Sequence, residues 1–195
     1  MYLYGASGHA KVIIDILEAN NIEIVGLFDD NENIKRLQDY EVFIADAVKG
    51  PLIVSIGNNK IRHRIVSSLD VEFGKAVHPT AIVSGKATIG NGTVVMQGAV
   101  IQSSSTIGQH VIINTGSTID HDCEIGDFVH IAPGCNLCGN VTIGEGAMLG
   151  AGSIVIPGVK VGKWCVIGAG SVVTKDIPDR ALASGNRCRV IKSIK

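Results

Sequence analysis

The chain has 195 residues and a formal net charge of -1 at pH 7, and 46% of its residues are hydrophobic. This hydrophobic content is sufficient for a buried core. Because the net charge is close to zero, the composition shows no excess of basic residues of the kind that binds nucleic acid. No apolar run approaches the roughly 18 residues that span a bilayer, and Met1 leads directly into strand-like residues without a signal peptide, so we expect a cytoplasmic protein.

The first 76 residues alternate short apolar runs with glycine turns and stretches of helical periodicity. A strand, a glycine turn, a helix and a second strand with a terminal acid make a small Rossmann-like unit. We therefore expect residues 1–76 to form an α/β domain. The expected elements are strands at 1–4, 22–28, 42–45 and 51–56, and helices at 10–19 and 60–69.

The turn before the first helix reads Gly5-Ala-Ser-Gly-His9 and suits a phosphate group. Its backbone N–H groups and the helix N-terminus both favour an anion. Asp29 and Asp30 close the second strand, where an acid commonly holds a ribose hydroxyl. The turn is GxxGH and not GxGxxG, so the dinucleotide fingerprint is incomplete and a nicotinamide cofactor is disfavoured. The alternative is that these glycines only form turns and the acids are only solvated.

From Val83 to Val173 an aliphatic residue occupies every sixth position, and a small or β-branched residue stands two positions before it. A period of six fits neither a helix nor a simple strand, so it predicts a solenoid of short strands separated by corners. Three hexads per turn give roughly five coils, with the aliphatic residues stacked inside at the strand spacing. The small residues are expected to point inward near the corners.

Five cysteines occur at irregular spacing, and three of them fill the small position of a hexad. Reduced cytoplasmic thiols are the natural interpretation. Cys135 and Cys138 form a CxxC pair without a second pair, so we expect no metal site.

The hexads resemble the left-handed parallel β-helix of hexapeptide-repeat acyltransferases. The stretches GASGH at 5–9, FDD at 28–30 and IGNN at 56–59, all ahead of the hexads, resemble the UDP-4-amino-sugar N-acetyltransferases of bacillosamine and related surface-glycan pathways. Sialic acid O-acetyltransferases share this layout. The resemblance implies an α/β Rossmann-like domain over 1–76, followed by an all-β left-handed parallel β-helix over 77–195. It also implies a homotrimer that binds acetyl-CoA between subunits.

Polar residues that the solenoid core does not need gather between Asn114 and Asp122. Transfer of an acyl group to an amine requires a base, and histidine, with an ordinary pKa near 6.5, suits that role. The resemblance makes His121 the general base and Asp122 its carboxylate partner, while Asn114 would position the amino sugar. Asp120 also flanks His121, and the sequence leaves open which acid contacts the ring.

The resemblance also implies the binding residues. In the closing segment, Gly185-Asn-Arg-Cys-Arg189 replaces the usual glycine-x-proline-alanine-basic element, and Arg187, Arg189 and Lys192 could meet CoA phosphates. For the nucleotide sugar, Ser7, Gly8 and His9 would contact phosphate, Asp29 and Asp30 uridine, and Gly57 the nucleotide where it nears the sheet edge. For acetyl-CoA, the implied contacts are His130, Gly139, Ala151, Ala169, Gly185 and Arg189.

Taken together, the sequence predicts an acetyl-CoA-dependent N-acetyltransferase acting on a UDP-linked 4-amino-4,6-dideoxy sugar, with acetyl-CoA as co-substrate and no bound cofactor or metal. Three alternatives stay open: O-acetylation of a sialic acid or similar sugar, a γ-type carbonic anhydrase, and a non-catalytic nucleotide-sugar-binding scaffold. His63, His78 and His110 are expected to lie on a helix surface, in an entry strand and at a corner.

Overall fold

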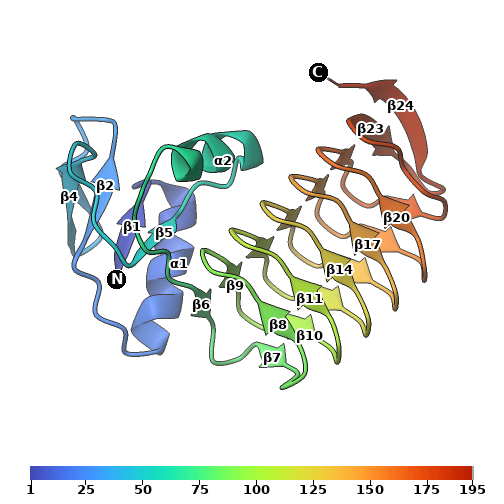
Figure 1. Cartoon of the computed structure of the whole chain (residues 1–195), viewed down its shortest axis with the longest axis horizontal. Helices are drawn as coiled ribbons and strands as arrows, with labels where there is room; N and C mark the ends of the chain where they lie inside the picture. The colour runs from blue at the N-terminus through green and yellow to red at the C-terminus, as the bar shows by residue number, and fades with distance from the viewer. Residues whose placement is uncertain (195) are drawn as a thin grey trace.

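The computed structural model describes residues 1–194 and shows an α/β body at one end of a long triangular coil (Figure 1). This architecture confirms the fold class expected from the hexads and the glycine turns. Five short strands build the sheet of the α/β body, in the order β3-β4-β2-β1-β5, and all neighbouring pairs but β3 and β4 run parallel. These strands are β1 (Tyr2–Tyr4), β2 (Gly26–Asp29), β3 (Arg36–Leu37), β4 (Tyr40–Ile44) and β5 (Leu52–Val54).

One helix covers each face of this sheet. Leu3 and Leu27 of the sheet pack against α1 (Gly8–Ala19), whereas the neighbouring Tyr4 and Phe28 point to the other face, where Ile65 of α2 (Asn59–Ser67) lies. Successive residues of a strand alternate between faces, so the two helices lie on opposite sides. The expected helices are present with slightly shifted ends.

The second strand is shorter than expected. It was predicted over 22–28, but β2 begins at Gly26, which pairs with Tyr2. Its neighbour β1 has only three residues, so the segment before Gly26 has no strand to pair with and makes only two hydrogen bonds to Met1, through Glu23 and Val25. The hairpin partner β3 was not predicted at all, because two residues carry no periodicity.

After the α/β body the chain winds through three parallel sheets, and each strand pairs with the one 18 residues later, as Ile113 does with Ile131. The first sheet holds β6 (Ala76–Val77), β9 (Val94–Val95), β12 (Ile112–Ile113), β15 (His130–Ile131), β18 (Met148–Leu149) and β21 (Val166–Ile167). The second holds β7 (Ile82–Val83), β10 (Val100–Ile101), β13 (Thr118–Ile119), β16 (Asn136–Leu137), β19 (Ile154–Val155) and β22 (Val172–Val173). The third holds β8 (Thr88–Ile89), β11 (Thr106–Ile107), β14 (Glu124–Ile125), β17 (Thr142–Ile143) and β20 (Lys160–Val161).

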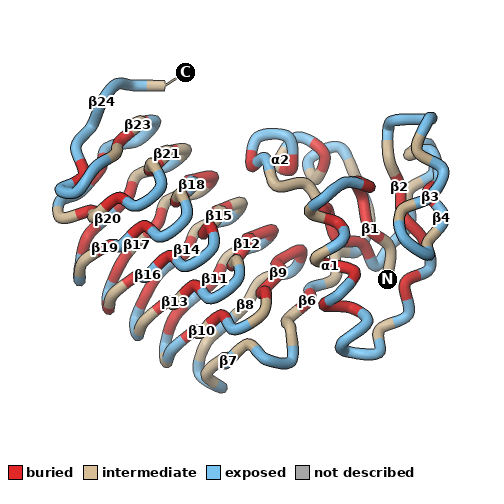
Figure 2. The backbone as a smooth tube through the Cα atoms, turned by 180° about the vertical axis from the view of Figure 1, so that it is seen from behind, coloured by how far each residue is buried: buried red, intermediate tan, exposed pale blue. Residues whose placement is uncertain are grey.

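The core of the coil follows the hexads. From Val95 onward, the aliphatic residue at every sixth position of the chain is buried. The small residues two positions before these, among them Ser117 and Cys135, are buried as well. Figure 2 shows these buried positions recurring along each coil. Val83 and Ile89 are only half-buried because they belong to the open first coil. The predicted stacking is confirmed.

The coil has three corners, and the functional residues divide among them. We call the turns from the first to the second sheet the first corner, those from the second to the third sheet the second corner, and those from the third back to the first sheet the third corner. The α/β body covers the start of the first sheet, where Val94 and Ile112 are buried against α1. Helix α2 lies along the third corner.

Two strands close the far end. β23 (Ala181–Ser184) extends the first sheet beside β21, and β24 (Arg189–Ser193) folds back antiparallel to it. The closing segment expected after Val173 is therefore present. Within residues 1–194 neither helix has the length and apolarity needed to cross a bilayer.

Candidate active site

His121 lies exposed on the second corner, between β13 and β14, and both flanking acids contact it at different atoms. Its ring nitrogen Nδ1 lies 2.7 Å from Oδ2 of Asp122. The Asp120 carboxylate instead accepts the backbone N–H of His121 at 2.8 Å. Asp122 has φ 58, and this left-handed turn brings its carboxylate back to the ring. The geometry thus separates the two acids that the sequence left open.

The electrostatics of this corner favour the protonated ring. The hydrogen bond to Asp122 and the nearby charge of Asp120 raise the pKa of His121 above its usual 6.5. A carboxylate only accepts hydrogen bonds, so Nδ1 carries the proton and Nε2 is left with its lone pair. This arrangement gives an exposed imidazole that can take a proton at Nε2 and hold the resulting charge.

Gly139 lies directly next to this ring, one coil further on. A side chain at Gly139 would place its Cβ 2.6 Å from Cε1 of His121, so only glycine leaves room for the imidazole. Gly139, which the resemblance gives as an acetyl-CoA contact, thus lies beside His121 on the second corner. A shallow groove of about 390 Å³ runs along the second sheet beside this corner and is lined in part by Thr118, Asp120 and Cys138.

The acids at the end of β2 hold the glycine turn in place. Asp29 accepts the backbone N–H of Ala6 at 2.7 Å, and Asp30 accepts the hydroxyl of Tyr4 at 2.7 Å. Ser7 is the N-cap of α1, but its side chain makes no capping hydrogen bond. The hydroxyl of Ser7 and the first N–H groups of α1 are thus presented at one end of the sheet.

Two histidines and Asn114 meet where the α/β body touches the first sheet. His130 Nδ1 lies 3.2 Å from the carbonyl oxygen of Gly57, and His130 Nε2 lies 3.3 Å from Nδ2 of Asn114. The ring of His9 is 6.5 Å away, between centroids. Burial, with the nearby charge of Arg62, lowers the pKa of His9 and of His130 to about 4. Both rings are therefore neutral at pH 7.

The remaining candidates for acetyl-CoA lie along the first corner and the closing strands. Ala151 follows β18 and Ala169 follows β21, and Gly150 packs against the backbone of Ala169. Gly185 stands in the turn between β23 and β24 with φ 107, and Arg189 is exposed at the start of β24. These residues line up along one edge of the coil.

The structure gathers the predicted residues into two groups that lie on different sides of the chain. His121, its acids and Gly139 share the second corner. Ser7, His9, Asp29 and Gly57 belong to the α/β body and face the first sheet, where Asn114 and His130 join them. A single chain does not bring the imidazole of His121 to the residues that were expected to bind the nucleotide.

Sequence reasoning missed the polar contacts that hold the α/β body on the coil. Arg62 is buried, and its guanidinium donates to the carbonyl oxygens of Ile56, His110 and Phe128 at 2.8–2.9 Å. Asn59 donates to the carbonyls of Gly146 and Ala147 at 3.1 Å. Nothing in the helical periodicity of α2 distinguishes a buried arginine from an exposed one, so only the packing reveals it.

His63 lies half-exposed on α2, as expected, but it also contacts the coil. Its ring packs edge-on against Phe128, 4.7 Å between centroids, and against Trp164. His110 lies at a corner, as expected, and stacks on Phe128. The five cysteines are free thiols, and within residues 1–194 no three of His, Cys, Asp and Glu are grouped so as to hold a metal ion.

A hexad coil with an acid-paired histidine at one corner and an α/β body on one face defines the class of hexapeptide-repeat acyltransferases. Comparison with known proteins agrees. Residues 1–69 match the model of the PglD N-terminal domain. Overlapping segments between 86 and 175 match that of the bacterial transferase hexapeptide repeat.

Two solved structures resemble nearly the whole chain. PerB from Caulobacter crescentus, in complex with CoA and GDP-perosamine, is 35% identical with a TM-score of 0.91, and the match covers 98% of this chain and 96% of that one. The acetyltransferase domain of PglB from Neisseria gonorrhoeae, in complex with acetyl coenzyme A, is 35% identical with a TM-score of 0.91, covering 97% of this chain and 98% of that one.

A curated relative, UDP-N-acetylbacillosamine N-acetyltransferase from Bacillus subtilis, is 37% identical over 110 residues, which is 48% of this chain and 50% of that protein. The chain spans half or less of the length of the curated relatives that it matches. The solved structures, however, match along almost their full length. The chain belongs to the family of hexapeptide-repeat sugar N-acetyltransferases with a PglD-type N-terminal domain.

Proposed function

We propose that this protein transfers the acetyl group of acetyl-CoA to the amino group of a UDP-linked 4-amino-4,6-dideoxy sugar, in the cytoplasm, for surface-glycan synthesis. The observation that carries the chemistry is the exposed His121 imidazole, fixed by Asp122 at 2.7 Å and seated on Gly139. The assignment of a uridine nucleotide is supported by the name of the curated bacillosamine relative.

In the proposed reaction the sugar amine attacks the thioester carbonyl and forms the new C–N bond. Nε2 of His121 takes the proton that the amine loses, while Asp122 stabilises the imidazolium. The tetrahedral intermediate then expels the thiolate of CoA as the C–S bond breaks, and the thiolate takes up a proton. Gly139 lies beside the ring, and its backbone N–H is our candidate donor to the oxyanion.

We further propose that the working unit is a trimer, because the two groups of predicted residues lie on different sides of one chain. A second copy could place the second corner of one chain against the α/β body and first corner of its neighbour. The sugar nucleotide, held by Ser7, Gly8, His9, Asp29, Asp30 and Gly57, would then meet the imidazole of the neighbouring chain. Acetyl-CoA would lie in the same groove, against Asn114, His130, Ala151, Ala169, Gly185 and Arg189.

The acceptor is tested by measuring thiol release from acetyl-CoA with matched acceptors: a UDP-4-amino-4,6-dideoxy sugar, the GDP-linked amino sugar perosamine, and a free sialic acid. The proposal expects the highest kcat/KM with the UDP sugar and an N-acetylated product by mass spectrometry. Faster turnover with the GDP sugar would refute the uridine assignment while keeping N-acetylation. Turnover only with the hydroxyl acceptor would refute amine transfer.

The trimer is tested by mixing two inactive variants, His121→Ala and Gly57→Trp, after joint refolding or co-expression. If the site is shared between chains, mixed trimers contain intact sites and recover part of the wild-type rate. Absence of any recovery in trimers shown to be mixed would place the whole site within one chain.

A further inference from the structure

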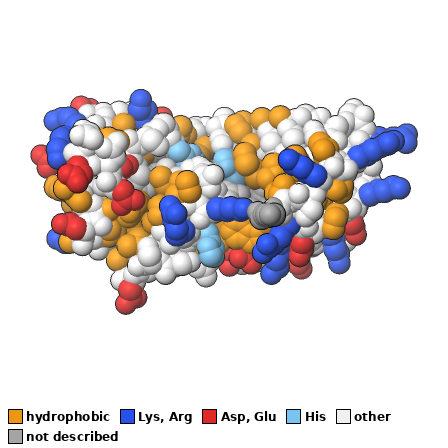
Figure 3. Space-filling view, turned by 90° about the horizontal axis from the view of Figure 1, so that it is seen from above, with side chains coloured by type: hydrophobic (Ala, Val, Ile, Leu, Met, Phe, Trp, Pro, Cys, Tyr) orange, Lys and Arg blue, Asp and Glu red, His pale blue; other side chains and the backbone are white. Residues whose placement is uncertain are grey.

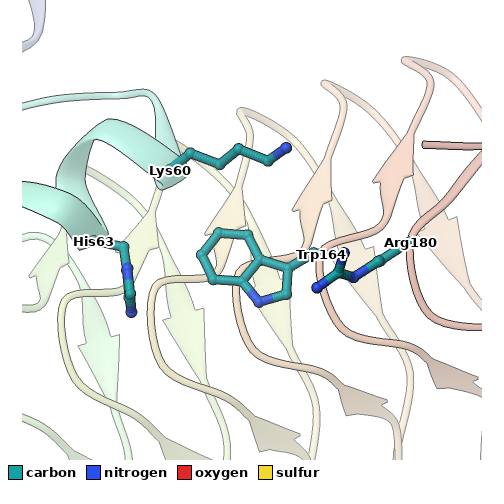
Figure 4. A pocket seen from close by; sticks show the side chains of 4 residues that line it. All are labelled: Lys60, His63, Trp164 and Arg180. Atoms are coloured by element: carbon teal, nitrogen blue, oxygen red, sulfur yellow. The ribbon is translucent and has the colours of Figure 1, made fainter. Parts of the chain in front are cut away.

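A small hollow outside the proposed active site opens between α2 and the last coils. It has a volume of about 240 Å³ and is lined by Lys60, His63, Trp164 and Arg180. Figure 4 shows the indole of Trp164 between His63 and Arg180, with Lys60 reaching over from α2. Within residues 1–194, the lining therefore combines one flat aromatic surface with two basic side chains and an imidazole.

The floor of this hollow is the end of an aromatic row on the third corner. His110, Phe128, Trp164 and Arg180 occupy equivalent positions on the third corner and all have φ between 53 and 58, while Gly146 takes this position in the coil between Phe128 and Trp164. Bulky side chains rarely adopt this left-handed conformation, which favours glycine. His110 and Phe128 are explained because their rings stack under α2. Trp164 also meets α2, through the ring of His63, and its remaining surface borders the hollow together with Arg180.

The glycine between these rings lets the indole lie flat. A Cβ at Gly146 would collide with Trp164, so the indole rests on the backbone of the coil below. His63 packs edge-on against it at 88°. One face of the ring is thus fixed by protein, and its other side borders the hollow.

The backbone of Arg180, opposite α2, is fixed by two backbone hydrogen bonds. Arg180 donates its N–H to Lys163 at 2.8 Å, and its carbonyl accepts the N–H of Ile194 at 2.7 Å. Its exposed side chain adjoins the indole (Figure 4). In the view from above, lysine and arginine side chains gather beside apolar surface near the middle of this face (Figure 3). An anion entering here meets preplaced positive charge.

We propose that this hollow is a second ligand site that binds a nucleotide, with the base stacked on Trp164 and the phosphate held by Arg180 and Lys60. An indole stacks on any planar base, and a guanidinium forms paired hydrogen bonds to phosphate oxygens. At about 240 Å³ the hollow is smaller than the roughly 300–1,000 Å³ that buries a whole ligand. It therefore fits the base and phosphate of a mononucleotide with its ribose at the opening.

The site is separate from the proposed acetyl-transfer groove. It lies on the third corner, whereas His121 lies on the second and the alanines proposed for acetyl-CoA lie on the first. Both sites share α2, since Lys60 and His63 face the hollow and Gly57 immediately precedes the helix. A nucleotide held here ties α2 to the last coils beside the sugar-nucleotide turn.

Trp164 is the single tryptophan of the chain, so its fluorescence reports on this hollow directly. The full-length protein is titrated with AMP, UMP, adenosine and inorganic phosphate, and the number of UMP sites is counted by calorimetry. Arg180→Gln removes the phosphate contact. Lys163→Gln is the matched control, because it removes one neighbouring positive charge that pairs with Glu145 and does not line the hollow.

The proposal predicts saturable quenching by a nucleotide, tighter than by adenosine or phosphate alone, with about tenfold weaker binding in Arg180→Gln and no change in Lys163→Gln. Whichever of AMP and UMP binds more tightly shows whether the ligand is an adenine or a uridine nucleotide. Trp164→Leu, checked by thermal unfolding, should lose one calorimetric site. No saturable quenching at millimolar nucleotide, equal loss in both charge variants, or phosphate binding as tightly as nucleotide would each overturn the proposal.

Discussion

At the scale of single residues, the second corner shows how two neighbouring acids take different roles around one imidazole. Asp122 reaches Nδ1 of His121 because its φ of 58 turns the chain back toward the ring. Asp120, which precedes the histidine, accepts the backbone N–H of His121 instead. Asp122 thus sets which ring nitrogen is free, and Asp120 fixes the backbone that carries the ring. The two acids should therefore differ in their effect on the acetyl-transfer rate.

Replacing Asp122 with Asn should lower the rate about tenfold or more and change its pH dependence. The Asp122 carboxylate raises the pKa of His121 above 6.5, and a base is active only when neutral, so the wild-type rate falls as the pH drops through that raised value. In Asp122→Asn the acid limb of kcat/KM should move to lower pH. Asp120→Asn should move it less. If the acid limb of kcat/KM stays at the same pH in Asp122→Asn, then Asp122 does not set the pKa of the base.

Gly139 offers a test of the ring position that leaves both acids intact. An alanine there would press its Cβ against the imidazole at 2.6 Å, so Gly139→Ala should displace the ring and lower kcat on the order of tenfold. Gly85 holds the equivalent corner position in the first coil with nothing within 4 Å, so Gly85→Ala is the control. Equal rates in the two alanine variants would show that the observed ring position does not matter for turnover.

At the scale of elements, α2 docks onto the coil mainly through polar groups. Arg62 satisfies carbonyl oxygens of both parts, and burial lowers its pKa to about 9, so it is still charged at pH 7. Its acceptors are carbonyls and the amide oxygen of Asn59. This contact fixes the Gly57 turn, and with it the carbonyl that holds His130.

Arg62→Met should destabilise the protein by about 3 kcal/mol, because several buried carbonyls lose their donor at once. The exposed Arg64 of the same helix is the control, and Arg64→Met should change the free energy of unfolding by less than about 0.5 kcal/mol. Chemical denaturation measures both. Equal, small losses would mean that water replaces the guanidinium and that Arg62 does not secure α2.

The coil was predictable from sequence because each hexad repeats one local rule, an aliphatic residue inside and a small residue two positions before. The α/β body was predicted less well, since the length of β2 depends on where its neighbour β1 begins, which is not a local property. Placement of Asn114 and His130 beside Gly57 depends on docking between distant segments. The burial of Arg62 and the packing of His63 also depend on docking between distant segments.

At the scale of the whole molecule, one buried histidine, His110, and two half-buried ones, His9 and His130, make the fold sensitive to acid. Burial, with help from the charge of Arg62, lowers the pKa of His9, His110 and His130 to about 4, below the 6.5 expected when the chain is unfolded. Between these values the unfolded chain binds more protons, so stability is present above pH 6.5 and is lost as the pH falls toward 4.

Each of these histidines should lower the free energy of unfolding by up to about 1.4 kcal/mol per pH unit in that window. The melting temperature, measured between pH 7.5 and 4.5, should therefore drop steeply below pH 6.5. His110→Phe removes one titrating ring from the row on the third corner and should make the slope shallower. A melting temperature that stays level down to pH 4.5 would contradict the neutral state of these rings.

The molecule carries its proposed chemistry at one corner and its proposed nucleotide-binding residues on another face. The measurement that tests this account most directly is acetyl transfer to a UDP-4-amino-4,6-dideoxy sugar by wild type and by His121→Ala, with UDP-sugar binding measured on both. We predict that the variant binds the sugar nucleotide as wild type does and loses transfer by about 100-fold or more. Wild-type rates in the variant would contradict His121 as the base, and wild-type protein that neither binds nor acetylates the sugar would contradict the proposed function.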